Sequence, residues 1–410
     1  MPEKRVVLRN CGFVNPADIS SYVDRDGFKA LEKALETMDQ ARVIEEVKAS
    51  GLRGRGGAGF PCGIKWEAAR NAPGNNKYII CNADEGEMGT FKDRYLIEND
   101  PFSLIEGLAI ACYAIGARQA YIYLREEYHF LVKVLKRAIE QTSAKAFSGN
   151  VKIAIVEGAG AYVCGEESAL MESIEGRRGE ARYRPPFPPI KGLFGKPTII
   201  NNVETLMNIP QIIMNGWKWF RSIGTDRSAG TKAFSVSGDV ESPGVYELPL
   251  GSRLRELIID LAAAKDTQAV QVGGAAGRLI PASMLDVELS YESVLGSGAV
   301  MVFNRSRDLI GLLHGIVQFF AEESCGKCVP CREGTQIMKE ILERMMNAQG
   351  ESGDLKVLEE LSALMNLSSL CGLGQSVAMP VLDSLSYFRS KLENRIAQSA
   401  LLRGLKGINQ

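Results

Sequence analysis

The sequence has little charge imbalance, no long apolar run and only two histidines, and each scarcity argues against a class of function. Its 48 lysine and arginine residues against 49 acidic residues leave a net charge of -1, which argues against a dominant nucleic-acid or anionic-membrane partner. The longest apolar stretch, LIEGLAIACYAIG at 104–116, is too short to span a bilayer and contains Glu106. His129 and His314 both fall in predicted helices and are expected to be packing or surface residues.

The N-terminal segment MPEKRVVLRNCGFVNP has neither an apolar core nor a small-residue cleavage site, so the sequence predicts a chain that is not exported. Five of the nine cysteines are scattered singly and are expected to be core residues. In a reducing cytoplasm, clustered cysteines are more often metal ligands or redox groups than disulfides. We therefore expect a cytoplasmic protein without a membrane span, in which grouped cysteines carry chemistry.

A first domain over residues 1–228 is expected to hold a parallel sheet. After a helix at 28–49, predicted strands and helices alternate: strand 77–81, helix 102–115, strand 120–124, helix 126–140 and strand 151–158. Such alternation is typical of doubly wound α/β sheets, which bind ligands beyond the carboxyl ends of their strands. The polar segments CNADEGE and EGAGAYVCGEE each follow a predicted strand, so they are candidates for a binding site.

The rest of the chain changes character twice. Residues 229–305 are predicted to form a small α+β module, with two strands around a Ser-Pro-Gly turn, a helix near 253–263 and strands at 269–274 and 299–303. Residues 306–410 contain four apolar-periodic segments, at 308–321, 333–346, 354–366 and 376–395. These segments predict a four-helix bundle that follows the module.

Three cysteines stand at three-residue intervals in SCGKCVPC, and a fourth follows forty residues later in SSLCGLG; they are Cys325, Cys328, Cys331 and Cys371. The spacing matches three ligands of a cubane [4Fe–4S] cluster, whose fourth thiolate comes from elsewhere in the chain. The two segments connect helices one to two and three to four of the predicted bundle, so both lie at the same end. A structural zinc site is the alternative, although zinc ligands usually come as two Cys-x2-Cys pairs.

The glycine-rich segment GLRGRGGAGF at 51–60 can expose a row of backbone amides to a phosphate or a flavin. Its spacing Gly54-x-Gly56-x-x-Gly59 fits the dinucleotide fingerprint, but no buried strand leads into it, so alone it predicts only a turn. Arg55 and Lys65 beside it offer positive charge for a phosphate.

Polar residues that suit the hydroxyls and ring edge of a flavin nucleotide gather in three segments. They are Asn82, Asp84, Glu85 and Glu87, then Glu166 and Glu167, then Asn201, Asn202 and Thr205. Each carboxylate taken singly could equally be a solvated or capping residue. Glu166 and Glu167 could also form a hydrolytic acid–base pair, but no Ser/His or Cys/His constellation accompanies them.

Five motifs resemble, in this order, the flavin-bearing NADH-oxidising subunit of bacterial NADH:quinone oxidoreductase, respiratory complex I. They are GLRGRGGAGFP…GIKW, CNADEGE…FKDR, GAYVCGEESAL, PPFPP…PTIINNVET and SCGKC.PCREG…LCGLG, and the resemblance covers about residues 10 to 395. It implies a Rossmann-like domain for FMN and NADH, a ubiquitin-like β-grasp module and a helical bundle with one [4Fe–4S] cluster. It also implies hydride transfer from NADH to FMN and single-electron transfer to the cluster, with no catalytic acid or base from the protein.

The resemblance assigns residues to each ligand. FMN falls on Gly54, Arg55, Gly56, Lys65, Asn82, Asp84, Tyr162, Gly165, Glu166, Asn201, Asn202 and Thr205. NADH falls on Phe60, Glu87, Glu167 and Phe187, and the cluster falls on the four grouped cysteines. Phe187 would stack on adenine, and Glu167 would repel a 2′-phosphate and so favour NADH over NADPH. Where some relatives have a second aromatic residue, this chain has Ala68, so we expect that part of the nicotinamide-nucleotide pocket to differ.

The resemblance also implies a partner subunit that bears a [2Fe–2S] cluster, a larger multi-cluster subunit, and a peripheral position on the cytoplasmic side of the inner membrane. Diaphorase subunits of NAD-linked hydrogenases and formate dehydrogenases share the same core, but many carry added cysteine clusters that are not found here. The respiratory subunit is therefore favoured over a diaphorase. A zinc-stabilised scaffold without enzymatic activity is the remaining alternative.

Overall fold

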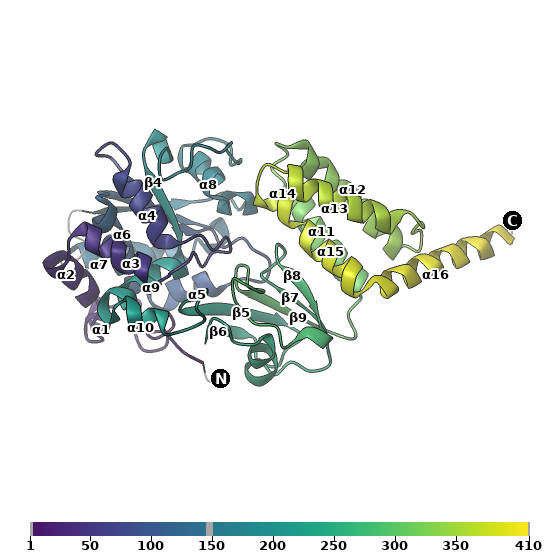
Figure 1. The fold of residues 1–410 in the computed structure, drawn as a ribbon, viewed down its shortest axis with the longest axis horizontal. Coiled ribbons are helices and arrows are strands. Elements are labelled where there is room, and N and C mark those ends of the chain that lie inside the picture. The colour runs from purple at the N-terminus through teal and green to yellow at the C-terminus, as the bar shows by residue number, and fades with distance from the viewer. Residues whose placement is uncertain (1–2, 145–150, 409–410) are drawn as a thin grey trace.

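The computed structural model describes residues 3–144 and 151–408, and it has three parts in chain order (Figure 1). A parallel sheet with its helices forms the first part, a second sheet lies below it in the view, and a set of helices lies to the right. The last helix extends away from the other two parts towards the C-terminus. Among the helices of these described ranges, none is both long enough and apolar enough to cross a membrane.

The first sheet has four parallel strands in the order β3-β2-β1-β4. They are β1 (Tyr78–Ala83), β2 (Gln119–Leu124), β3 (Lys152–Glu157) and β4 (Thr198–Asn202). The parallel α/β prediction is therefore confirmed, and β4 adds a strand that the sequence did not reveal. Because β4 pairs directly with β1, Asn202 lies opposite Asn82 at the carboxyl edge of the sheet.

Helices cover both faces of this sheet. The helices of the first part are α1 (Ile19–Val23), α2 (Lys29–Thr37), α3 (Gln40–Ala49), α4 (Cys62–Asn71), α5 (Lys92–Asn99), α6 (Pro101–Ile115), α7 (Leu131–Ala144), α8 (Glu167–Ile174), α9 (Val203–Asn215) and α10 (Trp217–Arg221). Alternate side chains of a strand point to opposite faces. Accordingly, Ile79 packs in one core with α6 and α9, whereas Ile80 packs in another with α8.

The prediction of one helix over 28–49 is wrong, because the chain breaks between α2 and α3. Met38 has an extended backbone, with φ -130° and ψ 136°, and Asp39 accepts a hydrogen bond from the backbone amide of Arg42 at 2.7 Å. A side chain that caps a new helix in this way ends the previous one. The short helix α3 then leads directly into the glycine-rich segment.

The second part is a mixed five-stranded sheet in the order β6-β5-β9-β7-β8. Its strands are β5 (Thr231–Gly238), β6 (Gly244–Pro249), β7 (Thr267–Val272), β8 (Arg278–Pro281) and β9 (Ala299–Asn304). Strands β5 and β9 pair in parallel, and the other pairs are antiparallel. The expected helix is a π-helical segment over Glu256–Leu261, whose Leu257 packs with Phe234 and Val270. The α+β module is confirmed, with β8 as an unpredicted strand.

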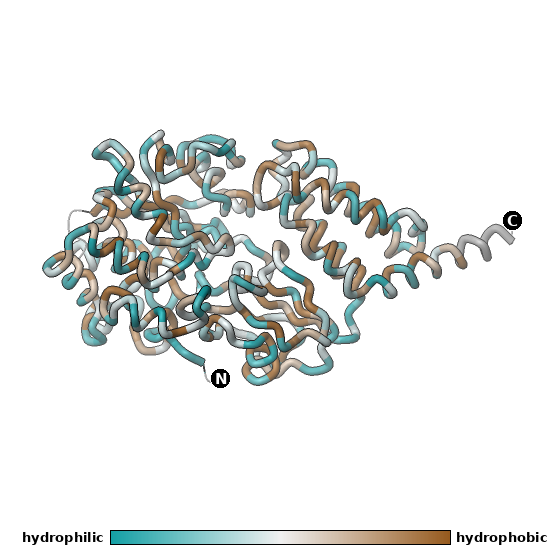
Figure 2. Tube along the Cα trace, viewed as in Figure 1, coloured by the Kyte–Doolittle hydropathy of each residue, from teal (hydrophilic) through white to brown (hydrophobic). Residues whose placement is uncertain are grey.

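The third part is helical. Its helices are α11 (Leu309–Glu323), α12 (Val329–Met346), α13 (Asp354–Ser368), α14 (Gly372–Ser376), α15 (Ala378–Tyr387) and α16 (Arg389–Ile408). Brown apolar and teal polar stretches alternate along these helices, as in amphipathic helices that share a core (Figure 2). The fourth helix predicted at 376–395 is not continuous, because the backbone leaves the helical conformation at Phe388, with φ -125° and ψ 16°.

The second and third parts are joined by a buried acid. Asp383 of α15 accepts hydrogen bonds from Arg278 of β8 at 2.7 and 2.8 Å, and from the backbone amide of Leu279 at 2.9 Å. Such a two-point guanidinium–carboxylate pair fixes orientation as well as distance. This contact holds α15 against β8 of the second sheet.

Candidate functional site

The glycine-rich segment forms a loop between α3 and α4 and is not preceded by a strand, as the sequence indicated. Gly57 and Gly59 have positive φ angles of 124° and 64°, which favour glycine. A Cβ added at Gly56 would lie 3.1 Å from the Cβ of Asn202. The loop therefore lies directly against the carboxyl end of β4.

A cavity of about 410 Å³ opens at this edge of the sheet. It is walled by the glycine loop, by the polar segments after β1 and before α8, by Gly273, Ala276, Gly296 and Ser297 of the second part, and by Gly372, Leu373 and Ser376 of the third. Seven of the residues predicted for FMN line it: Gly56, Asn82, Asp84, Tyr162, Gly165, Glu166 and Asn202. The volume falls in the range of small-molecule and cofactor sites.

The polar wall of the cavity contains an unsatisfied acceptor. Asn82 is fixed, because its side-chain amide donates to the carbonyl of Gly165 at 2.9 Å while its oxygen accepts from the amide of Asp84 at 3.0 Å. The Oδ2 atom of Asp84 is buried and has no hydrogen-bond partner among the described residues. Burial raises the pKa of this carboxyl to about 7. A buried acceptor without a donor fits a ligand that brings hydroxyl or N–H groups, as a flavin nucleotide does.

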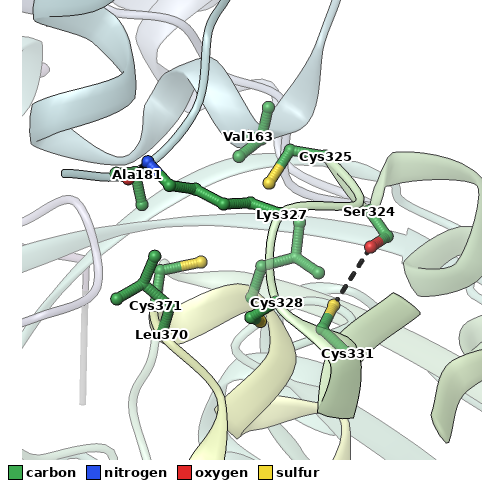
Figure 3. Close-up of a pocket in the computed structure, with 10 residues that line it drawn as sticks. Val163, Ala181, Ser324, Cys325, Lys327, Cys328, Cys331, Leu370 and Cys371 are labelled. Carbon is green, nitrogen blue, oxygen red and sulfur yellow. Dashed lines mark hydrogen bonds between the residues drawn. The ribbon is translucent and has the colours of Figure 1, made fainter. Parts of the chain in front are cut away.

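The four grouped cysteines line one further pocket, which joins the two predicted loops (Figure 3). Cys325 and Cys328 lie in the α11–α12 connection, Cys331 lies in the first turn of α12, and Cys371 directly precedes α14. The remaining five cysteines, Cys11, Cys62, Cys81, Cys112 and Cys164, are buried elsewhere. The structure thus brings together the four thiols that the sequence analysis assigned to one group, and the other five thiols are buried in the core.

The spacing of these thiols along the sequence favours a cluster over a single ion. Tetrahedral zinc holds its sulfurs at about 2.3 Å, and hence close to one another. In a cubane, each thiolate binds a different iron, and three of the ligands commonly come from a Cys-x2-Cys-x2-Cys run. The compact triplet, which shares one pocket with Cys371, therefore fits [4Fe–4S] better than the zinc alternative.

Comparison with known proteins agrees with both sites. The family model described as the Nuo51 FMN-binding domain matches residues 47–211, and that described as the NADH-ubiquinone oxidoreductase-F iron-sulfur binding region matches residues 311–395. The chain is 44% identical to the NADH-quinone oxidoreductase F subunit 2 of Rhizobium meliloti (strain 1021), over 96% of this chain and 98% of that protein. The chain belongs to this family. Its cofactors are accordingly FMN and a [4Fe–4S] cluster, and its substrate is NADH.

Subunits of hydrogenases are about as similar to this chain. It is 43% identical to NADP-reducing hydrogenase subunit HndC of Solidesulfovibrio fructosivorans, over 96% of this chain and 83% of that protein. Its structure matches a chain of the NAD+-reducing [NiFe]-hydrogenase in the H2-reduced state, with a TM-score of 0.87 and 41% identity. That match covers 95% of this chain and 70% of the other. The family therefore establishes an NADH-linked flavin and iron–sulfur subunit of the complex I type, without deciding its assembly.

Five residues predicted for FMN lie outside the cavity lining: Gly54, Arg55, Lys65, Asn201 and Thr205. The backbone amide of Arg55 donates to the hydroxyl of Thr205 at 2.8 Å, and its guanidinium contacts Tyr291 and the carbonyl of Ala229 at 3.0 and 2.7 Å. Lys65 donates to the carbonyl of Ile200 at 2.9 Å. Both cations thus have partners within the protein, and their predicted contacts with FMN stay predictions.

Buried charges next to the cavity were missed by sequence reasoning. The ammonium of Lys92, the only lysine or arginine side chain in the described lining, lies 2.6 Å from Asp93 and 3.0 Å from Glu204. Glu204 also lies 2.5 Å from Lys232 of β5. Burial alone would raise the pKa of Glu204, but the two ammonium groups hold it below its ordinary value. This network of four ionisable side chains, the buried tetrad, joins the first two parts of the chain beneath the site, and burial lowers the pKa of Lys232 to about 7.

The tetrad also positions a predicted flavin residue. The side-chain amide of Asn202 donates to Asp93 at 2.7 Å, and its oxygen caps α9 by accepting from the backbone amide of Glu204 at 3.0 Å. The segments FKDR and NNVET therefore meet in space. Their charges gave no decisive signal in sequence, because lysine and acidic residues are normally solvated.

Of the four residues predicted to bind NADH, one lines the cavity and three lie outside its lining. Glu87 lines the cavity, where it accepts from the hydroxyl of Tyr162 at 2.9 Å and burial raises its pKa to about 7. Phe60, Glu167 and Phe187 are not among the described residues of the lining, and both phenylalanines are about half exposed, at 52% and 55%. The backbone amide of Ala276 lies 3.4 Å from Glu87, so the second part of the chain contributes to this wall.

We expect Asp84→Asn to stabilise the flavin-free protein at pH 8 while weakening FMN binding. Because the folded-state pKa of Asp84 is raised to about 7, the folded chain holds a proton between pH 4 and 7 that the unfolded chain has released. The free energy of unfolding of the wild type therefore falls by at most about 4 kcal/mol as pH rises through this window. The uncharged amide of the Asp84→Asn variant does not titrate, so the variant should not show this loss. Melting curves at pH 5 and pH 8 measure the effect. The exposed Asp226→Asn is the matched control, and equal pH dependence in all three proteins would contradict the prediction.

Proposed function

We propose that the chain is the NADH-dehydrogenase subunit of a respiratory NADH:quinone oxidoreductase. The observation that carries the NADH-dehydrogenase part of this proposal is the contact between its two pockets. Val163 and Leu373 line both the flavin-sized cavity and the four-thiol pocket. Two apolar side chains thus stand between the sites, which supports direct electron transfer between them.

In this account, the chain's own residues bind, orient and exclude water. Gly56 and its neighbouring glycines keep side chains out of the cavity, and Asn82 and Asp84 hold the polar groups of the flavin. Phe187 would stack on the adenine of NADH. FMN, when bound, takes up a hydride from NADH and supplies single electrons. Cys325, Cys328, Cys331 and Cys371 would hold the [4Fe–4S] cluster as thiolates.

Glu167 is proposed to select NADH over NADPH. Its carboxylate lies 2.9 Å from Arg184 and 3.8 Å from Lys65, beside the proline-rich loop that carries Phe187. A nearby carboxylate repels the 2′-phosphate of NADPH. We expect Glu167→Gln to raise kcat/KM for NADPH relative to NADH by about tenfold, the effect of ~1.4 kcal/mol. Steady-state rates with both nucleotides measure this ratio, with the exposed Glu360→Gln as control. An unchanged ratio would remove Glu167 from this role.

The proposed assembly places the chain on the cytoplasmic side of the inner membrane, held by a [2Fe–2S]-bearing subunit and a larger multi-cluster subunit. The relatives support this, because several are named as F subunits of NADH-quinone oxidoreductase. A diaphorase subunit of a hydrogenase is the second candidate, supported by the match with an NAD+-reducing [NiFe]-hydrogenase.

Affinity purification of the tagged chain from its native cells tests this choice. We expect the co-purified complex to reduce a quinone with NADH and to show a [2Fe–2S] signal by electron paramagnetic resonance. A complex that instead contains nickel and reduces NAD+ with hydrogen would establish the diaphorase.

A further inference from the structure

A hydroxyl group lies against one of the four thiols. The Oγ atom of Ser324 is 3.2 Å from the Sγ atom of Cys331, and both residues line the four-thiol pocket (Figure 3). When Cys331 binds iron as a thiolate, the sulfur can only accept, so Ser324 becomes the donor. Cys331 is buried, and hydrogen bonds in such surroundings are stronger than in water.

A lysine from within the cysteine triplet also lines this pocket. The side chain of Lys327 crosses the pocket in Figure 3, and its ammonium donates to the carbonyl of Ala181 at 2.8 Å and lies 3.0 Å from Glu180. The ammonium also lies 5.4 Å from the ring centre of Tyr183. The lysine is therefore held in place by the first part of the chain.

Arg178 completes this attachment. Its guanidinium donates to the backbone carbonyl of Cys325 at 2.8 Å. Residues 178–183, called here the strap, thus contact the cysteine loop through four groups. These are the guanidinium of Arg178, the carboxylate of Glu180, the carbonyl of Ala181 and the ring of Tyr183. The strap directly precedes the proline-rich loop, so the part of the chain proposed to bind NADH also positions the charges around the thiols.

Lys327 and its partner Glu180 do not cancel each other at the pocket. Lys327 lines the pocket, whereas Glu180 is not among its described lining residues and is more exposed, at 34% against 24%. Water screens the more exposed charge more effectively. The cation is therefore expected to act more strongly than its partner on any group held between the thiols.

We propose that Ser324 and Lys327 raise the reduction potential of the [4Fe–4S] cluster, with Lys327 held for this purpose by the strap. This inference rests on the proposed ligation by the four cysteines. Potentials of iron–sulfur clusters depend on hydrogen bonds to the sulfurs and on nearby charge. A donor to a ligand sulfur and a cation that lines the same pocket both stabilise the form that carries one more electron. Ser324 and Lys327 are positioning residues and not ligands.

The test is an anaerobic redox titration of the full chain with its cluster, with dithionite as the source of the single electron. The reduced cluster is followed by electron paramagnetic resonance, and the flavin separately by absorbance. Ser324→Ala and Lys327→Gln are each expected to lower the cluster midpoint potential, and Ser324→Thr and Lys327→Arg to retain it. In the double variant, the ratio of reduced to oxidised cluster at a fixed potential should fall on the order of tenfold, about 59 mV for a one-electron couple.

One variant is expected to shift the cluster midpoint potential in the opposite direction. Glu180→Gln removes the partner of Lys327 and leaves the cation, so the midpoint potential is expected to rise. Loosening of the loop would not produce opposite shifts from the two ends of one ion pair. Ser368→Ala and Lys339→Gln, which change a serine and a lysine on α13 and α12 away from the pocket lining, are the matched controls and should show no shift.

Each outcome has a distinct meaning. Unchanged midpoints in Ser324→Ala and Lys327→Gln, with iron content retained, would overturn the inference. If either variant loses its iron, the Glu180→Gln variant provides the test. A cluster midpoint potential that does not rise in Glu180→Gln would also overturn the inference. A wild-type protein that holds no iron at these cysteines would instead overturn the proposed ligation.

Discussion

Replacing Cys371 by alanine is expected to remove the iron–sulfur cluster while leaving FMN in place. Cys371 is the one thiol of the four that comes from the α13–α14 connection, and a cubane with three cysteine ligands lacks a protein bond to its fourth iron. Iron should fall from about four atoms per chain to near zero. NADH should still bleach the flavin, but the electron paramagnetic resonance signal of the reduced cluster should be absent. Iron analysis and spectra of the anaerobically purified variant measure both effects.

Cys112→Ala is the matched control for this prediction. Cys112 is fully buried in α6, within the core of the first part, and does not line either pocket. It should retain iron and flavin and lose only stability. Retention of about four irons in Cys371→Ala would show that the fourth ligand lies elsewhere.

Glu204→Gln is expected to destabilise the protein more than any surface substitution. The change leaves the ammonium groups of Lys92 and Lys232 in a fully buried environment with one fewer negative charge. Removing one partner of a buried ion pair costs about 3–5 kcal/mol. For a domain of this size, that cost corresponds to a fall in Tm of roughly 10 °C. Because Asn202 is positioned by the same network, we also expect weaker FMN binding.

Two further variants test whether the loss of stability in Glu204→Gln comes from the unpaired buried charge. Glu98→Gln breaks an exposed pair with Arg94 on α5, for which at most about 1 kcal/mol is expected. Glu204→Gln combined with Lys232→Met removes one acid and one base together and should recover part of the lost Tm. Calorimetric melting of the four proteins measures these differences. A single variant Glu204→Gln that melts like the wild type would show that the buried tetrad does not stabilise the fold.

The grouping of the four cysteines in one pocket could be predicted because its signal is local. Cys325, Cys328 and Cys331 stand at fixed short spacing, and Cys371 follows from counting helices and assigning loops to one end of a bundle. The parallel sheet was equally accessible, since its strands are short apolar runs separated by helices. These features depend on a few neighbouring residues and on general rules of connection.

The walls of the cavity could not be predicted, because they come from all three parts of the chain. Gly296 and Ser297 of the second part and Gly372 of the third line the same cavity as Gly56. These contacts depend on long-range packing, for which a glycine or a serine in a loop carries no signal. The same holds for β4, whose position beside β1 is set by the sheet and not by its own short polar sequence.

The orientation of long charged side chains could not be predicted from the sequence either. Arg55 belongs to the glycine loop, and its guanidinium contacts Tyr291 and the carbonyl of Ala229, which the sequence did not indicate. Lys92 was given no role, and it lines the cavity. Which way a flexible cation turns depends on where its partners lie in space, and those partners are far away in the chain.

The central claim is that one chain carries electrons from NADH through FMN to a cluster held by four cysteines. The most direct test is the visible spectrum of the anaerobically purified protein, with its iron, zinc and flavin content, before and after NADH and, separately, NADPH. We predict about one FMN and about four irons per chain, with the flavin bleached by NADH and not by NADPH. A protein that contains zinc, holds neither flavin nor iron, and does not respond to NADH would contradict the account.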